Sequence, residues 1–269
     1  MKYWRKYNGT IIPKRPPHVL VSDSEIEIKT FIKSESAFFA RWVSEFDVST
    51  ESEFWYIIND TPMNILDYAS KVRNEIRRGL KEFNVELINS DYLLDYGYAI
   101  YIAAFNNYKA DLLPKTEAEF KTELLSELGV WEYWGVIRGG VMVAYCKVKI
   151  FKDCCEYSSI KFHPKYLKLH PSAALIYTMN HSYLNDRGFK YVNNGSRSLY
   201  HVTNFPNFLM KKFKFRKAYC NLQIMYSPWV AFALKIIYPF RFVLKYFNNK
   251  FIDRIKVLIK HEEIRRSFI

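Results

Sequence analysis

The densest group of side chains that could do chemistry lies in residues 193–204, NNGSRSLYHVTN, directly after a strand-like segment. An imidazole titrates near neutral pH, so His201 could act as a general base. Glu156, at the start of an earlier strand-like segment, is the competing base, and Ser198 is the third candidate catalytic side chain. Loops that follow strands are where α/β folds bind ligands. The residues expected to contact a substrate are Asn194, Ser196, Arg197, Tyr200 and Asn204. A turn-rich connection without chemistry is the alternative.

A second candidate site is the stretch HPKYLKLHPSAAL, residues 163–175, which follows an alternating, strand-like run. Its outline is that of a phosphate-binding turn before a helix, because the N-terminus of a helix is electropositive. The glycines that such a turn normally uses are missing, and other residues adopt a positive φ only at a cost. We expect the helix to begin near Ser172. Lys165, Lys168 and His170 add charge near that end.

The periodicity of apolar residues predicts an α/β (α+β) fold. Spacing of three and four residues over 64–84 predicts an amphipathic helix. From 131 to 227 the predicted order is β-β-β-α-β-α-β, with a hairpin turn at Arg138-Gly139-Gly140. Hairpins followed by a βαβ crossover imply a mixed β-sheet flanked by helices. The predicted divisions are a β-rich lead-in at 1–63, a main domain at 64–227 and a tail at 228–269.

The tail at 228–269 is aromatic, aliphatic and basic, with nine Lys or Arg residues against three acids. It predicts two or three amphipathic helices. Its most apolar stretch is interrupted by Lys235 and Pro239, well short of the roughly 20 apolar residues that a membrane span needs. Such a composition suits a helix that lies on an anionic lipid surface, and packing against the domain core is the alternative.

The charge and the motifs of the sequence limit the kinds of partner and of catalytic site that we expect. A net charge of +13 and a pI near 9.4 favour nucleic acid, anionic lipid or a polyphosphate cofactor. The absence of HExxH, Walker and GxSxG motifs leaves hydrolase and triphosphatase functions without support. The histidines and the four cysteines show no metal-ligand spacing, so no metal is expected. The N-terminus lacks the apolar run of a signal peptide, so we expect a cytoplasmic protein. Peripheral attachment to the inner face of the membrane is compatible with this expectation.

The second candidate site resembles the cofactor loop of the GNAT acyltransferase superfamily: a strand, then Pro164-x-Tyr166, then Ala174-Leu175 at the start of a helix. Two segments are more similar to the Fem-type branch of that superfamily. VRNEIRRGLKEFNVELI at 72–88 resembles the basic helix and strand that open its acyltransferase domain. HPSAALIYTMNHSYLNDRGFKYVNNGSRS at 170–198 resembles its next helix, closing glycine and strand. The resemblance covers residues 64–227.

The resemblance implies an acyltransferase that moves an acyl group from acyl-CoA to an amine or hydroxyl of a small molecule or envelope precursor. The amine or hydroxyl would attack directly, strand N–H groups would stabilise the oxyanion, and the turn would hold the carrier. The residues implied in cofactor binding are Ser159, Ile160, Lys161, Phe162, Leu169, His170, Ser172 and Ala173.

Two departures from the superfamily's pattern leave other functions open. The positions of its Arg-Gly-x-Gly-x-Gly loop are occupied by other residues: Leu167, Lys168, His170 and Ser172. The usual tyrosine acid falls near Met210. The missing glycines and the +13 charge favour an alternative donor, aminoacyl-tRNA, as in Fem-type aminoacyl transfer. A non-catalytic fold that binds membrane or nucleic acid is a further alternative.

Overall fold

The computed structural model describes the chain except residues 1–2, 108–112, 128, 200–202, 248 and 269. The chain forms two compact units, each assembled from segments that are distant in sequence. Unit 1 contains residues 1–57, 196–204 and 217–269, and unit 2 contains residues 58–195 and 205–216. Each unit has its own strands, helices and hydrophobic clusters.

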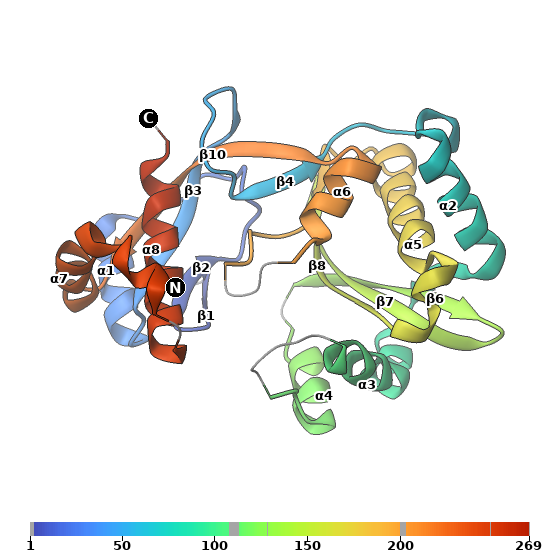
Figure 1. Cartoon of the computed structure of the whole chain (residues 1–269), viewed down its shortest axis with the longest axis horizontal. Coiled ribbons are helices and arrows are strands. Elements are labelled where there is room, and N and C mark those ends of the chain that lie inside the picture. Colours follow the sequence, from blue (N-terminus) through green and yellow to red (C-terminus); the bar gives the residue numbers. More distant parts are fainter. Residues whose placement is uncertain (1–2, 108–112, 128, 200–202, 248, 269) are drawn as a thin grey trace. The chain divides into compact units, whose positions relative to one another are not determined.

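Unit 1 is built on four paired strands (Figure 1). β1 and β2 form an antiparallel hairpin, β2 pairs parallel with β3, and β3 pairs antiparallel with β10. The bounds of these strands are β1 Trp4–Tyr7, β2 Thr10–Pro13, β3 Phe39–Val48 and β10 Arg216–Tyr226. The helices of the unit are α1 Glu25–Ser34, α7 Pro228–Ile237 and α8 Lys250–Arg266.

Helix α1 lies in a region where the sequence pattern predicted only strands and turns. It begins at a capping box, in which the Ser24 hydroxyl accepts a hydrogen bond from the Glu27 N–H at 3.3 Å. The Glu27 carboxylate in return accepts the Ser24 N–H at 2.8 Å. Two orphan donors of the first turn are thereby satisfied. Ile28 and Ile32 then bury the inner face of the helix against β1 and β3 residues.

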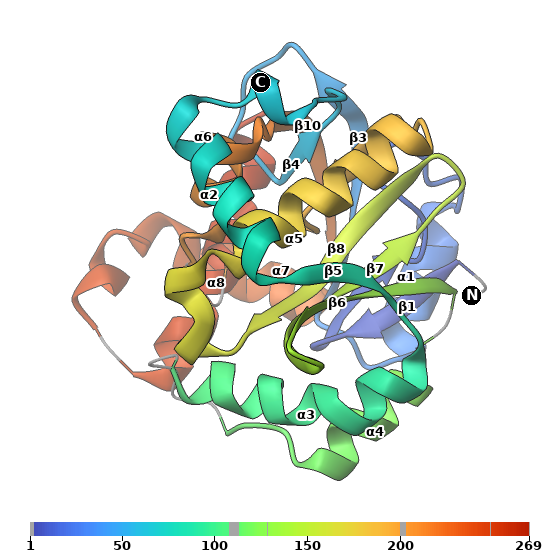
Figure 2. The ribbon, with the colours of Figure 1, turned by 90° about the vertical axis from the view of Figure 1, so that its right-hand side faces the viewer.

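Unit 2 contains a mixed sheet with helices on both faces (Figure 2). Its strands follow one another in the order β4, β9, β8, β7, β6, β5, and of these pairs only β8–β9 is parallel; the first two residues of β4 belong to unit 1. Their bounds are β4 Tyr56–Asn59, β5 Asn84–Ile88, β6 Val130–Arg138, β7 Val141–Ile150, β8 Cys154–Phe162 and β9 Tyr191–Asn193. One face carries α2 Ser70–Glu82 and α5 Pro171–Asn180, and the other carries α3 Ser90–Asn106 and α4 Glu117–Leu125.

The predicted fold class is confirmed: the chain has a mixed sheet flanked by helices, and it ends in helices. The order predicted for residues 131–227 is observed as β6, β7, β8, α5, β9, α6 (Phe205–Phe213) and β10. The hairpin turn lies at Gly139 and Gly140, whose φ angles are 55° and 79°. Positive φ at both central residues is what a tight hairpin turn requires, so the glycines are needed there.

A buried histidine on α8 packs against the sheet of unit 1. The His261 ring lies 5.2 Å from the Phe39 ring and 5.4 Å from the Trp55 ring. Its Nδ1 is 2.8 Å from the Val257 carbonyl oxygen, and its Nε2 faces the Arg41 guanidinium. Because the carbonyl needs a donor and Arg41 needs an acceptor, the ring is neutral with its proton on Nδ1. Burial, and then the Arg41 charge, lower the pKa of His261 to about 3.

We expect this histidine to make the protein acid-sensitive. The unfolded ring takes up a proton below its ordinary pKa of 6.5, whereas the folded ring stays neutral down to about pH 3. The free energy of unfolding should therefore fall by about 2–3 kcal/mol between pH 6.5 and about pH 4.5 from this residue alone. His261→Gln should be less stable at neutral pH but lose less stability over this interval. Urea denaturation at a series of pH values measures both, and parallel curves for the two proteins would contradict the assignment.

Candidate active site

The site begins where two parallel strands of unit 2 separate. β8 and β9 pair only at Cys154–Tyr191, Cys155–Val192 and Glu156–Asn193. Ser158 then forms a β-bulge, because the register of β8 on β7 shifts between Val148 and Lys147. Beyond Glu156, none of the described strands pairs with this edge of β8. The two strands therefore separate along residues 158–162 of β8.

The direction of the β8 backbone groups follows from one hydrogen bond. The His163 N–H donates to the Val143 carbonyl oxygen at 2.9 Å, which makes this a hydrogen-bonded pair of the antiparallel ladder. Since such pairs alternate, Lys161 and Ser159 also point their N–H groups at β7. Ile160 and Phe162 point theirs toward the open edge. Of the four strand residues that the sequence implied in cofactor binding, two thus direct their backbone donors toward the open edge.

The Lys161 side chain lies on the sheet face that α3 covers. Its Nζ is 6.0 Å from the centre of the Tyr101 ring. Burial lowers the pKa of the Lys161 ammonium, and the nearby charges of Lys115 and Lys147 lower it further. A lysine with a lowered pKa holds more neutral amine near physiological pH, and a neutral amine can take a proton. The sequence had indicated only a binding role for this residue.

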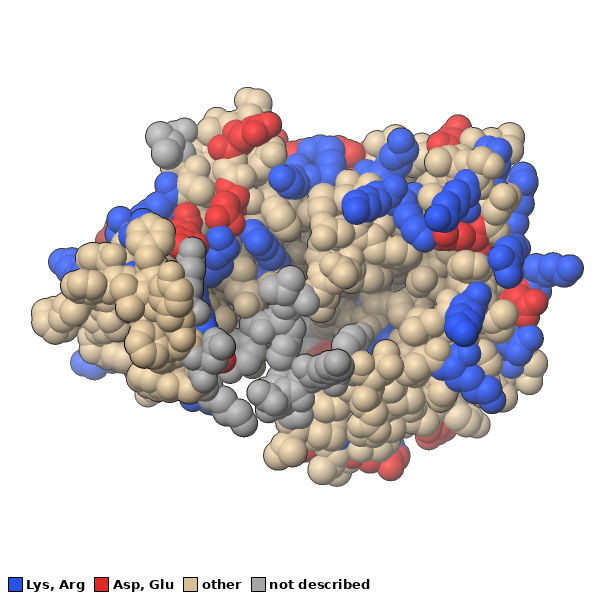
Figure 3. Space-filling view, in the orientation of Figure 1, with Lys and Arg blue, Asp and Glu red and all other residues tan. Residues whose placement is uncertain are grey.

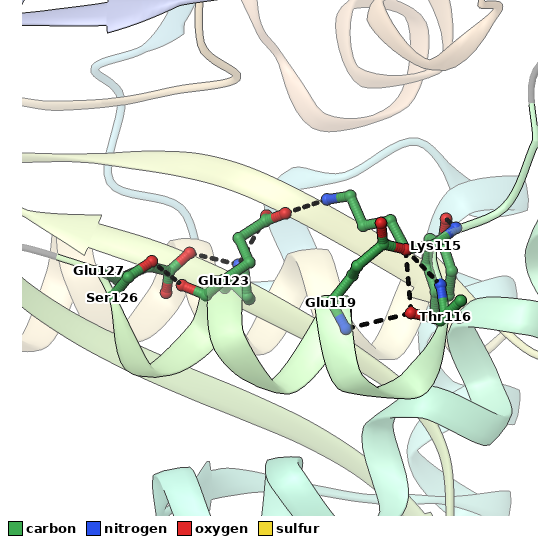
Figure 4. A network of polar contacts seen from close by, with 8 residues as sticks. Lys115, Thr116, Glu119, Glu123, Ser126 and Glu127 are labelled. Carbon is green, nitrogen blue, oxygen red and sulfur yellow. Dashed lines mark hydrogen bonds and ion pairs between the residues drawn. The ribbon is translucent and has the colours of Figure 1, made fainter.

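A network of charges on α4 fixes the surroundings of Lys161 (Figure 4). Lys147 on β7 pairs with Glu127 and lies 3.8 Å from a Glu123 oxygen. Glu123 also pairs with Lys115, at the start of the helix. Lys147 is only 7% exposed, and these two carboxylates are partners of its ammonium group. Glu123 on the helix and Glu127 just beyond its end therefore hold Lys115 and Lys147 close to Lys161.

The turn between β8 and α5 is folded on itself, with hydrogen bonds between its own backbone groups. Residues Pro164–Leu169 form a 3-10 helix, and His170 adopts a left-handed conformation with φ 62°. The helix does not begin at Ser172 as predicted: His170 is its N-cap and Pro171 its first residue, because the fixed φ of proline suits that position. The N–H groups of Ala173 and Ala174 both donate to the His170 carbonyl, at 3.1 and 3.3 Å. These two donors are therefore engaged, and the Ala173 side chain is buried.

Helix α2 covers the N-terminus of α5. A Cβ on Gly79 would lie 2.6 Å from the His170 carbonyl oxygen and 3.0 Å from the Ala174 Cβ. Only glycine permits this approach. Beside the contact lies a groove of about 580 Å³ lined by Ser70, Lys71, Asn74, Glu75, Arg78 and His170. Figure 3 shows Lys and Arg side chains gathered over the part of the surface where α2 lies in Figure 1.

The polar segment at 193–204 is divided between the two units. Asn194 belongs to unit 2, whereas Ser196, Arg197, Ser198 and Asn204 belong to unit 1. Arg197 is held within unit 1: its guanidinium pairs with Glu53 at 3.0 Å and lies 4.5 Å from the Phe54 ring centre. Tyr200 and His201, the predicted base, lie outside the described residues. Glu156, the competing base, lies beside Gly195, where an added Cβ would be 3.5 Å from its Oε1.

Asn193 is a residue of the site that the sequence did not indicate. Its side-chain Nδ2 donates to the Cys155 carbonyl at 3.0 Å, and its Oδ1 accepts the Gly195 N–H at 2.8 Å. The side chain is fully buried. It holds β9 against β8 at the last paired position before the strands separate.

The α2–α5 contact gives a test of how the groove is built. Gly79→Ala would gain about 1 kcal/mol of helix propensity, but its Cβ would meet a backbone oxygen that cannot move aside. We expect a net loss of about 1–3 kcal/mol in the free energy of unfolding. Arg77→Ala, on the exposed side of the same helix, is the control and should change stability little. Thermal denaturation compares the two, and an equal or higher melting temperature for Gly79→Ala would contradict the close contact.

Known proteins resemble this chain in structure but not in sequence. The sequence matches no protein-family model and none of the curated proteins. The structure is similar to FemX, with a TM-score of 0.51 and 10% identity over 79% of this chain and 77% of that one. It is also similar to the C-terminal domain of a putative lysylphosphatidylglycerol synthetase from Agrobacterium fabrum, with TM-score 0.48, 11% identity, and 87% and 82% coverage. L-PGS from Bacillus licheniformis gives TM-score 0.47, 12% identity, and 98% and 85% coverage.

Identities this low bear on the fold and not on activity, and FemX is the one of the three whose TM-score exceeds 0.5. The similarity to FemX extends over both units, since it covers 79% of the chain. It agrees with the resemblance seen in residues 64–227. The chain has a fold similar to that of FemX.

Proposed function

We propose that this protein is a transferase that moves an acyl or aminoacyl group from a polyanionic carrier to an amine or hydroxyl by direct attack. The observation that supports this best is the open edge of β8, with the Ile160 and Phe162 N–H groups directed away from β7. Unpaired backbone groups inside a sheet are costly unless something else pairs with them. A carbonyl that becomes an oxyanion is such a partner, and backbone donors stabilise it strongly.

Aminoacyl-tRNA fits the carrier site better than acyl-CoA. At the start of α5, Pro171 has no N–H group and the Ala173 N–H is bonded to the His170 carbonyl, so few backbone donors are left for a pyrophosphate, and the turn contains no glycine. The groove instead offers the cationic side chains of Lys71 and Arg78. Other cations of unit 2 extend the charge along α2 and α6: Arg73, Arg77, Lys81, Lys211 and Lys212. A charged surface of this extent suits a nucleic-acid backbone. Acyl-CoA remains the second candidate donor, because the groove lies at a helix N-terminus.

The general base in this proposal is Lys161. The attacking amine or hydroxyl forms a bond to the carbonyl carbon of the ester, and its proton passes to the neutral Lys161 amine. The carbon–oxygen bond to the carrier then breaks, and the departing oxygen takes the proton back from the ammonium. The acceptor in this scheme is a small molecule or an envelope precursor that carries the amine or hydroxyl.

Replacing Lys161 tests the base. Lys161→Arg keeps the positive charge but cannot lose a proton, so we expect kcat to fall about a hundredfold or more with a smaller change in KM. Wild-type activity should rise with pH through a pKa below the ordinary lysine value of 10.5, and the variant should lack that rise. Lys168→Arg, on the exposed surface of the turn, is the matched control. An unchanged kcat and pH profile in Lys161→Arg would remove it from the mechanism.

Replacing the groove cations tests the carrier. The double variant Lys71→Gln/Arg78→Gln should bind aminoacyl-tRNA at least about tenfold more weakly and lower the salt slope of binding by about 1–2. Lys29→Gln/Lys33→Gln on α1 removes the same charge from unit 1 and should have little effect. Filter binding across a salt series measures both.

The same proteins decide between the two donors. Transfer from charged tRNA, with no thermal stabilisation by acyl-CoA, is the result expected here. Stabilisation by acyl-CoA that is lost in the groove variant, without tRNA binding, would establish the second candidate. Release of the acyl group from neither carrier, across a panel of amine and hydroxyl acceptors, would contradict the transferase.

A further inference from the structure

The C-terminal tail exposes a large apolar surface in unit 1. Of the 24 large apolar residues that are exposed in the described chain, nine fall between positions 229 and 251. They are Trp229, Phe232, Ile236, Phe240, Phe242, Val243, Tyr246, Phe247 and Phe251. They lie on α7, on the short 3-10 helices Tyr238–Phe240 and Val243–Tyr246, and at the start of α8. Single exposed apolar residues are ordinary, but a run of this length marks an interaction surface.

Helix α7 is apolar on two opposite faces. Val230 and Leu234 are buried and pack with Ile259 of α8, which accounts for the inner face. Phe232 and Ile236, four residues apart on the outer face, are 68% and 53% exposed. Packing of the tail on its unit therefore explains only the inner face. Figure 3 shows the surface over α7 as almost entirely uncharged, with Lys and Arg at its margin.

The charge of this segment has a single sign. Residues 228–252 contain four Lys or Arg and no Asp or Glu. Arg241 sits among the aromatic residues, with its guanidinium carbon 4.1 Å from the Phe242 ring centre and 4.6 Å from that of Tyr238. Aromatic rings interleaved with cations fit the boundary between lipid headgroups and acyl chains. There the rings are buried against the acyl chains, and the cations are attracted to anionic headgroups.

The length of the helices decides how such a surface meets a bilayer. Among the described residues, every helix is too short or too polar to cross a membrane. The ten residues of α7 extend about 15 Å, half the thickness of the hydrocarbon core. The helix can lie in the interface plane with its outer face in the lipid.

We propose that the α7 surface, formed by the outer face of α7 and residues 238–251, docks on an anionic lipid bilayer. A second copy of this chain is the other occupant to consider. In a two-fold dimer the same patch faces itself, so the positive charges of the two copies would be brought together, and the carboxylate beside Arg241, Glu263 at 4.0 Å, already pairs within its own copy. An anionic bilayer supplies negative charges that face these cations, and its interface accommodates the aromatic side chains.

Flotation with lipid vesicles tests the proposal without any assay of activity. The full-length protein should float with vesicles of phosphatidylcholine and phosphatidylglycerol, and much less with phosphatidylcholine alone or at high salt. Phe232→Gln/Ile236→Gln should lower the partition coefficient at least about tenfold, because both apolar side chains lose their burial in lipid. Ile26→Gln, at a position that is 76% exposed on α1, is the matched control and should bind normally.

Circular dichroism and the melting temperature show whether each variant folds. If the double variant does not fold, the variant Lys235→Gln tests the lipid contact independently, through its charge. Lys235→Gln should weaken binding to the anionic vesicles about fivefold while leaving the neutral vesicles unaffected. Equal flotation of wild type and variants would overturn the proposal. A dimer in solution that becomes a monomer in Phe232→Gln/Ile236→Gln, with no vesicle binding by either, would show that a second copy occupies the surface instead.

Discussion

Two buried asparagines end neighbouring strands of unit 2, and the open edge of β8 depends on them. Asn193 closes β9 by bonding across to the Cys155 carbonyl and back to the Gly195 N–H. Asn59 closes β4 in the same manner, donating to the Phe213 carbonyl at 3.0 Å and accepting the Thr61 N–H at 3.0 Å. Each side chain takes over hydrogen bonds that a longer strand would have made. Because both are fully buried, losing either partner would leave a polar group without compensation, which costs about 1–3 kcal/mol. The strands can therefore stop without disordering the sheet.

The pattern of backbone hydrogen bonds also distinguishes the turn before α5 from a glycine-rich phosphate-binding loop. In a glycine-rich loop the backbone approaches a phosphate, and the helix N–H groups remain available to it. Here Pro171 supplies no N–H group, the His170 carbonyl accepts the Ala173 N–H, and a glycine that allows close approach to a backbone oxygen, Gly79, lies on α2. That glycine brings two helices together instead of bringing backbone to ligand. Side chains surround this contact, and Lys71 and Arg78 among them line the groove.

The sequence predicted what local pattern controls and missed what tertiary contact controls. The hairpin at Gly139 and Gly140 and the order of elements from 131 to 227 followed from periodicity and turn chemistry, and both are present. The start of α5 was misplaced by the choice of Ser172 as a cap, although Pro171 signalled the position. The segment 193–204 was taken as one site because it is continuous in sequence, yet it passes from one unit to the other after Gly195. No local pattern reveals that passage, nor that Asn193 would end a strand.

Lys161 shows why a candidate base could not be chosen from sequence. Its pKa depends on burial under α3 and on Lys115 and Lys147, which lie 46 and 14 positions away in the chain. Those cations stay in place because Glu123 and Glu127 pair with them; Glu123 lies on the short helix α4, and Glu127 lies two residues beyond its end. The capping box of Thr116 and Glu119 fixes where that helix begins. A shift of the helix by one residue would turn Glu123 away from Lys115 and Lys147, because successive helical residues point about 100° apart. Lys147 would keep Glu127 but lose Glu123, so the cap at Thr116 helps to set the charge around an amine on another strand.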